Sequence, residues 1–530
     1  MKMAKRLFTM ALALMMILSL AVPAFAAEEA ETYTIVINHP QKKTNHIYEA
    51  YQIFSGELSV DEATGREVLS NIEWGDGVDG DALLAALKTE SSLFADATDA
   101  QTVADVLSKN NTNTALVNTF RHVVGEHLIA EKAVEQNAVS EDGVYTWNNM
   151  PAGYYLIKDQ DGSLEGTEET ATNYILQVVG DTTVKPKGGG VTHDKLIEDG
   201  GNRVEVADYS IGDDVKFVLR GTLPANYADF VNYSYKFVDT LSAGLTFNND
   251  VKVYVETSGS KLELTTGYVV NSVNPTVTGA TFTVDFADLK QITEVTVESH
   301  STIIVEYTAK LNEDAVIGGN GNPNESYVIF DNDPHNEGEG ETPKDKVFAF
   351  TWELDVFKID GNNNKLADAE FVLYRNIDAT TQYVKVNADG EVTDWTVDET
   401  EASILKSDSN GKFIVKGLEA DVYYLKETKA PEGFNLLEQP ITVDISATIS
   451  ESADGTTAVV DSLQIKVDNH PAADGDKEHG IVSMNVVNNP GATLPETGGI
   501  GTTLFYVFGA LLVAASFVLL VTKKRMTMEN

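Results

Sequence analysis

Three predicted strands in the last third of the chain each end an apolar face with a different polar group. Successive side chains of a strand point to opposite faces, so every second residue shares a face. By this rule Lys358, Glu427 and Asn488 follow the stripes Trp-x-Leu-x-Val, Tyr-x-Leu and Val-x-Met-x-Val. A lysine at the end of an apolar face is costly to bury unless it is neutral or bonded. The three residues therefore direct an amine, a carboxyl and a carboxamide toward one core.

Such a triad has the parts of an intramolecular isopeptide bond. Burial lowers the pKa of an amine and raises that of a carboxyl, which favours the neutral form of both. The amine of Lys358 can then attack the side-chain carbonyl of Asn488, while Glu427 polarises that carbonyl and relays protons as ammonia leaves. Packing the three groups in one dry core supplies the effective concentration. The sequence predicts a Lys358–Asn488 bond, formed once per chain and promoted by Glu427.

Two other interpretations of these residues stay open. Lys358 can extend its amine to the surface and form an ordinary ion pair with Glu427 there. Asn485 and Asn489 are alternative amides, but each falls on the opposite and more mixed face of its strand. We favour Asn488 for this reason.

A similar pattern occurs in the middle of the chain. Asp239 ends the aromatic stripe Val-x-Tyr-x-Tyr-x-Phe, and Asn332 follows Val328-x-Phe on its own face. Lys195 lies at the start of this part of the chain, although its face is not clearly apolar. Lys236 is the competing lysine, but alternation places it opposite the aromatic face, as a solvated strand residue.

Both ends of the chain carry export features. The N-terminus has basic residues, an apolar run over 7–22 and an Ala-Phe-Ala motif, the three parts of a secretory signal peptide, with cleavage predicted after Ala26. Near the C-terminus an apolar run over 504–521 is followed by two lysines and an arginine. A run of this length can nearly cross a membrane, and its basic tail then stays cytoplasmic.

The residues before that apolar run are Leu494, Pro495, Glu496, Thr497 and Gly498. In this order the C-terminus resembles the cell-wall sorting signal of Gram-positive surface proteins. The resemblance implies that a sortase cleaves between Thr497 and Gly498 and holds Thr497 as a thioester. Membrane retention is then transient, and the mature chain of residues 27–497 is passed on for covalent attachment to the cell wall.

Composition excludes several classes of function. The 530 residues include no cysteine, which excludes disulfides, thiolate zinc sites and a cysteine nucleophile. A net charge of -43 argues against a nucleic-acid partner. Nine scattered histidines predict no metal cluster, the acidic loop at 331–333 is interpreted as a solvated turn without EF-hand spacing, and no cofactor is expected. Motifs of zinc proteases, serine hydrolases and P-loop enzymes are missing from the sequence.

Short Val/Thr/Tyr-rich segments between turn signals predict a mainly β chain of three tandem immunoglobulin-like β-sandwich domains. Helical spacing of apolar residues at 81–88 and 100–133 predicts a helical insertion in the first domain. The predicted divisions are a signal peptide 1–26, an N-terminal domain 27–187, a middle domain 188–346, a C-terminal domain 347–493 and a sorting signal 494–530.

The segment Glu427-Thr-Lys-Ala-Pro-Glu-Gly-Phe, preceded by Tyr423-x-Leu, resembles the E-box of major pilins and of collagen-adhesin (Cna) B-type domains. The arrangement of Lys195, Asp239 and Asn332 resembles the middle domain of major pilins, and this resemblance implies a second cross-link in which Lys195 is joined to Asn332 with Asp239 as the promoting acid. When Tyr154-Tyr-Leu of the first domain is aligned with Tyr423-Tyr-Leu, Lys158 takes the position of Glu427. An acid follows one residue later, on the other face, so no isopeptide bond is predicted there.

Val184-Lys-Pro-Lys187 precedes three glycines and predicts an exposed lysine on an extended stub. It resembles the pilin motif of sortase-assembled backbone pilins, with Lys185 in place of the usual tyrosine. The resemblance implies that a pilin-class sortase joins Thr497 of one subunit to Lys187 of the next, with Lys185 as the alternative nucleophile. The expected partners are this sortase, further copies of the chain, minor tip and base pilins, and peptidoglycan.

These features predict the structural backbone subunit of a pilus, or fimbrium, on the surface of a Gram-positive cell. Apart from its self-directed isopeptide chemistry, the chain is not expected to be an enzyme. The alternative is a monomeric, wall-anchored adhesin that binds host matrix and has no use for Lys187.

Overall fold

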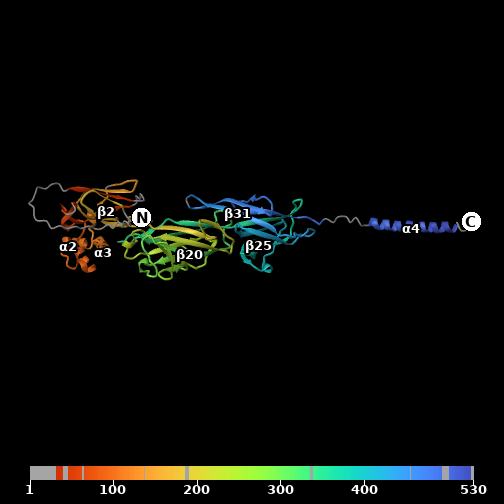
Figure 1. Ribbon diagram of the computed structural model, residues 1–530, viewed down its shortest axis with the longest axis horizontal. Helices are drawn as coiled ribbons and strands as arrows, with labels where there is room; N and C mark the ends of the chain where they lie inside the picture. Colours follow the sequence, from red (N-terminus) through yellow and green to blue (C-terminus); the bar gives the residue numbers. More distant parts are fainter. Residues whose placement is uncertain are drawn as a thin grey trace, which may run out of the picture.

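The computed structural model describes residues 31–39, 46–62, 65–136, 138–185, 190–334, 338–453, 455–491 and 500–526. Within them, three β-rich blocks follow one another along the long axis of the molecule (Figure 1). The predicted signal-peptide cleavage at Ala26, the predicted linkage residues Lys187 and Thr497, and the sorting pentapeptide 494–498 lie outside the described residues.

The N-terminal block packs two sheets around a core that contains Tyr48, Trp147 and Ile157. One sheet has the order β5-β6-β1-β9, and the other the order β3-β2-β7-β8, with β4 paired to β2. The strands are β1 (Thr32–Asn38), β2 (Tyr48–Val60), β3 (Glu67–Trp74), β4 (Val134–Glu135), β5 (Ala138–Val139), β6 (Val144–Pro151), β7 (Gly153–Asp159), β8 (Asn173–Val178) and β9 (Thr182–Val184).

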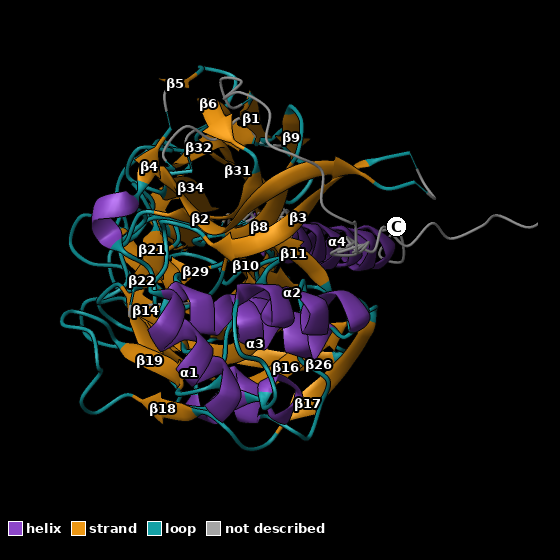
Figure 2. Cartoon of the chain, turned by 90° about the vertical axis from the view of Figure 1, so that its left-hand side faces the viewer, coloured by secondary structure: helices purple, strands orange, loops and turns teal. Residues whose placement is uncertain are grey.

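The predicted helical insertion is present as α1 (Gly80–Glu90), α2 (Ala100–Lys109) and α3 (Thr114–Gly125). Each helix begins after a side chain that accepts a hydrogen bond from its first turn, the N-caps Asp79, Asp99 and Asn113. Their apolar faces bury leucines, valines and Phe120 against Phe54 of the sheet. Figure 2 shows the three helices gathered on one side of the block, below β2, β3 and β8.

The middle block is a sandwich of two seven-stranded sheets. The first sheet contains β10 (Thr192–Asp199), β11 (Asn202–Val204), β13 (Asp214–Thr222), β15 (Leu245–Phe247), β16 (Lys252–Thr257), β17 (Ser260–Leu264) and β20 (Thr302–Leu311). The second contains β12 (Val206–Asp208), β14 (Tyr235–Leu241), β18 (Val269–Asn271), β19 (Phe282–Phe286), β21 (Asn322–Asp331), β22 (Glu339–Glu341) and β23 (Asp345–Phe350). Since β23 pairs with β12 and β21, the predicted boundary after residue 346 falls inside a strand of this block.

The C-terminal block packs a three-stranded sheet, β29-β24-β34, on an eight-stranded sheet. The small sheet contains β24 (Trp352–Asp360), β29 (Lys412–Leu418) and β34 (Ile481–Asn488), with β24 and β34 parallel. The large sheet contains β25 (Glu370–Ile377), β26 (Thr380–Val386), β27 (Val392–Thr396), β28 (Leu405–Lys406), β30 (Val422–Lys429), β31 (Ile441–Glu451), β32 (Ala458–Val467) and β33 (Ala473–Asp474).

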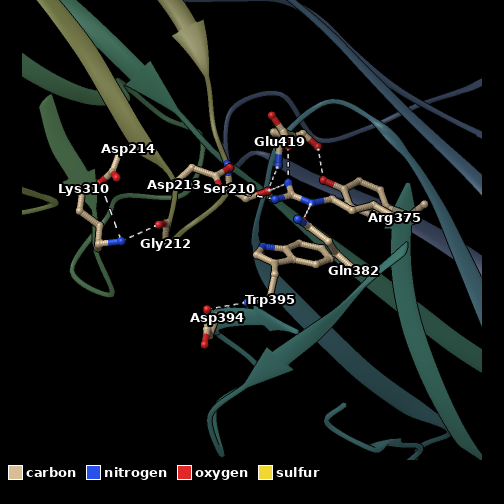
Figure 3. A network of polar contacts seen from close by, with 11 residues as sticks. Ser210, Gly212, Asp213, Asp214, Lys310, Arg375, Gln382, Asp394, Trp395 and Glu419 are labelled. Carbon is tan, nitrogen blue, oxygen red and sulfur yellow. Dashed lines mark hydrogen bonds and ion pairs between the residues drawn. The ribbon is translucent and has the colours of Figure 1, made fainter. Parts of the chain in front are cut away.

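Polar side chains and close backbone contact join the middle block to the C-terminal block. Arg375 of β25 is buried, donates to Ser210 and Glu419, and lies over the ring of Trp395 at 4.0 Å (Figure 3). Elsewhere at this junction a Cβ on Gly318 would lie 2.4 Å from the Cα of Gly480, so only glycine allows this approach. Buried polar contacts and a direct backbone approach therefore join the two blocks.

The remaining helix, α4 (Ile500–Met526), contains the predicted apolar run. Residues Thr503–Arg525 are long and apolar enough to cross a membrane, with a mean hydropathy of 2.6. Its last turn holds the three basic residues.

Candidate functional site

The C-terminal block brings Lys358, Glu427 and Asn488 into contact between its two sheets. Lys358 and Asn488 come from the parallel strands β24 and β34, and Glu427 comes from β30 of the facing sheet. All three side chains are buried, with exposed fractions of 0%, 3% and 1%. The Nζ of Lys358 donates to Oδ1 of Asn488 over 2.7 Å, and Nδ2 of Asn488 donates to Oε1 of Glu427 over 3.0 Å.

The surroundings of this centre hold each group in place. Lys358 also donates to the carbonyl of Val486 over 3.0 Å, and the backbone N–H of Leu437 donates to Oε2 of Glu427 over 2.8 Å. Burial lowers the pKa of Lys358 to about 8, although the nearby Glu427 opposes this shift. The neutral amine, which is the nucleophilic form, is therefore far more abundant near neutral pH than in an ordinary lysine with a pKa of about 10.4.

The structure does not support a surface position for Lys358 or a role for the two neighbouring asparagines. Lys358 does not extend to solvent, because its ammonium group lies between the two sheets. Asn485 and Asn489 are exposed. Alternation along the strand placed Asn488 correctly because β34 is regular up to its last residue.

The middle block holds a second buried lysine–acid pair. Nζ of Lys195 in β10 lies 2.6 Å from Oδ2 of Asp239 in β14, and both side chains are fully buried. The hydroxyl of Tyr307 donates to the same Oδ2 over 2.8 Å. Burial lowers the pKa of Lys195 and raises that of Asp239, and their mutual attraction opposes both shifts. The competing Lys236 lies half-buried on the other face of β14.

The structure does not bring Asn332 to this pair, and this predicted placement is wrong. Asn332 is buried, but its Nδ2 donates to the carbonyl of Leu164 in the N-terminal block over 2.8 Å. In the register of β14 and β21, Asp239 faces Ser326, so Asn332 lies six residues further along, roughly 20 Å away at the usual rise per residue. Asn332 shares the inward face, but at the opposite end of the sandwich.

Asn324, not Asn332, is the asparagine that lies near Asp239. It is fully buried, it lies two residues from Ser326 on the same inward face, and its Nδ2 donates to the hydroxyl of Tyr307 over 2.7 Å. Its Oδ1 has no hydrogen-bond partner among the described residues. Because β14 and β21 run antiparallel, Asp239 near the end of β14 lies opposite the beginning of β21, where Asn324 is found.

In the N-terminal block, Lys158 contacts Asp161, and Asp159 accepts a hydrogen bond from Nδ1 of His46 over 2.8 Å. Two of the histidines that are scattered along the sequence lie together here. The rings of His39 and His46 stack with their centroids 4.9 Å apart, and Glu169 lies beside them. The two histidines meet because they flank the connection from β1 to β2.

Of the two candidate linkage lysines, Lys185 is described. It is exposed and directly follows β9, whereas residues 186–189 lie outside the described residues. In the predicted solvated turn at 331–333, the carboxylate of Asp331 accepts hydrogen bonds from the N–H and hydroxyl of Ser234, both over 2.7 Å.

Comparison with known families matches three successive parts of the chain. Residues 211–334 match the Gram-positive pilin backbone subunit 2, Cna-B-like domain, and residues 353–458 match the SpaA prealbumin-like fold domain. Residues 486–526 match the LPXTG cell wall anchor motif. Together these matches give the chain a Gram-positive pilin backbone domain, a prealbumin-like domain and a cell wall anchor motif. The anchor match indicates a surface protein anchored to the cell wall, and it includes the whole of α4.

The chain also resembles known proteins in sequence and in fold. It is 25% identical over 374 residues to the trypsin-resistant surface T6 protein of Streptococcus pyogenes serotype M6, and the match spans 60% of this chain and 65% of the T6 protein. The solved T6 backbone pilin, described as a modular three-domain structure, is similar in fold with a TM-score of 0.52 and 17% identity, over 88% of this chain and all of that one. The major pilin SpaD of Corynebacterium diphtheriae aligns with a TM-score of 0.46 and 17% identity, over 87% and 98% of the two chains.

Proposed function

We propose that this pilin is the repeating shaft subunit of a covalent pilus. The observation that carries the proposal is the presence, in one chain, of a pilin backbone domain and a cell wall anchor. The arrangement of three blocks along one axis supports it, because a subunit of this shape extends a fibre when joined end to end (Figure 1). The exposed Lys185 lies beside the segment that contains Lys187.

Polymerisation would follow from two acyl transfers. A pilin-class sortase cleaves the bond between Thr497 and Gly498 and holds Thr497 as a thioester. The amine of Lys187 from another subunit attacks this thioester, which releases the enzyme thiol and leaves an amide bond between Thr497 and Lys187. Lys185 is the alternative nucleophile. Minor pilins would occupy the ends of the fibre, and an amine of peptidoglycan would accept the last subunit.

We further propose that the two buried lysine centres form intramolecular isopeptide bonds. In each, the lysine Nζ bonds to the amide carbon of an asparagine, the amide C–N bond breaks, and ammonia leaves with the protons that the acid relays. The C-terminal centre joins Lys358 to Asn488 with Glu427 as the acid. For the middle centre, the contacts of Tyr307 with both Asp239 and Asn324 support a Lys195–Asn324 bond in place of Lys195–Asn332.

The linkage is tested in the native host with single lysine variants. Lys187→Ala should abolish the ladder of covalent multimers seen after boiling in detergent, while monomer is still made and secreted. Lys185→Ala is the matched control and should leave the ladder intact. Ladders that persist in Lys187→Ala but vanish in Lys185→Ala would move the linkage to Lys185. A wild-type chain that stays monomeric would overturn the shaft proposal in favour of the monomeric adhesin.

A further inference from the structure

We propose that His39, His46 and Glu169 form a binding site for a divalent transition-metal ion of the zinc class. Each residue offers one ligand atom, and these atoms lie within 4.8 Å of one another. All three side chains are buried, with exposed fractions of 1%, 2% and 2%. Two imidazoles and one carboxylate are a ligand set that zinc uses in proteins, with a fourth position open to water.

His46 is oriented as a metal ligand. Its Nδ1 lies 2.8 Å from Oδ1 of Asp159, which can only accept, so Nδ1 carries the proton. The lone pair of the neutral ring is then on Nε2, and no hydrogen-bond partner reaches this buried atom among the described residues. A carboxylate that holds the far nitrogen of a ligating histidine is a common feature of metal sites, because it fixes both the tautomer and the ring orientation.

The surrounding structure fixes the rings. Tyr48 stacks on His46 at 5.1 Å with an interplanar angle of 5°, and His39 stacks on His46 with a centroid distance of 4.9 Å. Asp159 is itself held by the backbone N–H and the hydroxyl of Thr172. A tetrahedral zinc ion needs about 3.4 Å between ligand atoms, which follows from zinc–nitrogen distances of about 2.0–2.1 Å. The site therefore has to close by roughly an ångström.

Charge also favours a cation. The cluster of His39, His46, Asp159 and Glu169 contains two carboxylates and two imidazoles, all buried. Burying carboxylates is costly unless they are paired or bind a metal, and a dication would offset the negative charge that this buried cluster carries. Nitrogen ligands favour zinc over calcium or magnesium, which prefer oxygen.

A metal at this position would hold together a junction of the fold. Glu169 belongs to the connection from β7 to β8, whose next residues bond to the middle block. Thr170 donates to Asn226 over 2.9 Å, and the N–H of Ala171 donates to the carbonyl of Asn332 over 2.6 Å. On its other side, the carbonyl of Glu168 accepts from the N–H of Val191, just after the segment that contains Lys187. The site would be structural, since burial keeps substrates away from the ion.

The test is metal titration of the full chain, purified in mild detergent and stripped with a chelator. Zinc should bind with one equivalent by calorimetry and raise the thermal midpoint, whereas calcium should do neither. Cobalt at the same site should give the visible absorption of a tetrahedral nitrogen–oxygen complex. Binding without stoichiometry, or an octahedral cobalt spectrum, would overturn the proposal.

Variants locate the site. His46→Gln and Glu169→Gln should each remove the tetrahedral cobalt spectrum, and Asp159→Asn should weaken zinc binding about 10- to 100-fold because it acts only through His46. His479→Gln, an exposed histidine of the C-terminal block, is the control and should bind as the unaltered chain does. The metal-free thermal midpoint reports whether each variant is folded. Folded Glu169→Gln that binds zinc normally would exclude this site.

Discussion

Glu427 lies closer to the amide nitrogen of Asn488 than to the amine of Lys358. Its Oε1 is 3.0 Å from Nδ2 of Asn488 and 3.9 Å from Nζ of Lys358. The carboxyl group therefore contacts the nitrogen that must leave, while the amine contacts the carbonyl oxygen of the same amide. This arrangement suits an acid that delivers a proton to departing ammonia better than one that serves only as a counter-ion.

The first prediction concerns the mass of the folded chain. Residues 27–497 should be lighter than their sequence mass by two ammonia molecules, because each isopeptide bond releases one. Asn488→Ala and Asn324→Ala should each restore the mass of one ammonia, and Asn332→Ala should restore none. Intact-mass spectrometry measures all four chains. Loss of one ammonia from Asn324→Ala and of two from Asn332→Ala would support a Lys195–Asn324 bond. Loss of two from Asn324→Ala and of one from Asn332→Ala would support a Lys195–Asn332 bond instead.

The second prediction concerns the acids. Glu427→Gln should leave Lys358 and Asn488 unjoined, since glutamine can hydrogen-bond the amide but cannot relay a proton. Asp239→Asn should act in the same way in the middle block. By analogy with cross-links that close a loop of about 100 residues, each loss should lower the stability of its block by about 4–5 kcal/mol. Denaturant titration measures this, with Lys236→Ala as a control. Complete cross-linking in either acid variant would contradict the mechanism.

The third prediction is a pH dependence that appears only when the C-terminal cross-link is absent. In Asn488→Ala the free amine of Lys358 should keep a folded-state pKa near 8, against about 10.4 when unfolded. The folded chain then binds fewer protons than the unfolded chain between these values, so stability should rise with pH across this window. Below pH 8 the buried amine of Lys358 is charged, and its full destabilising effect is present. Deprotonation at higher pH removes this effect and raises the free energy of unfolding by at most about 3 kcal/mol.

Urea titrations from about pH 7 to pH 10 measure this effect. Lys358→Met in the same Asn488→Ala background lacks the titrating amine and supplies the baseline. The difference between the two variants isolates Lys358 from other lysines that titrate at high pH. A difference that does not change with pH would mean that Lys358 is not held in a dry environment.

The fourth prediction concerns the junction of the middle and C-terminal blocks. Arg375→Ala should leave Glu419 without its partner and remove the packing on Trp395. Breaking a fully buried ion pair costs about 3–5 kcal/mol, and we expect a smaller loss here because the Glu419 side chain is 24% exposed. We expect a lower thermal midpoint and faster proteolysis at the junction. Lys310→Ala, at a half-exposed position of the same network, should change neither (Figure 3). An unchanged midpoint in Arg375→Ala would show that the blocks are not coupled through this network.

The sequence alone determined which residues face inward. Lys358, Glu427, Asn488 and Asp239 follow from a period of two along single strands, which is a local property of the backbone. The mainly β composition, the helical insertion and the membrane-length run at the C-terminus are equally local. The order of motifs along the chain then sufficed for the resemblance to backbone pilins.

Only the tertiary structure decided where each inward-facing residue lies along the length of its sandwich. Asn324 of β21 and Asn332, one residue beyond its end, both face inward, and only the register with β14 places Asn324, not Asn332, near Asp239. Register depends on pairing between distant strands, which the period of one strand does not contain. The meeting of His39, His46 and Glu169 has the same origin, because one sheet connection brings the histidines together and another supplies the acid.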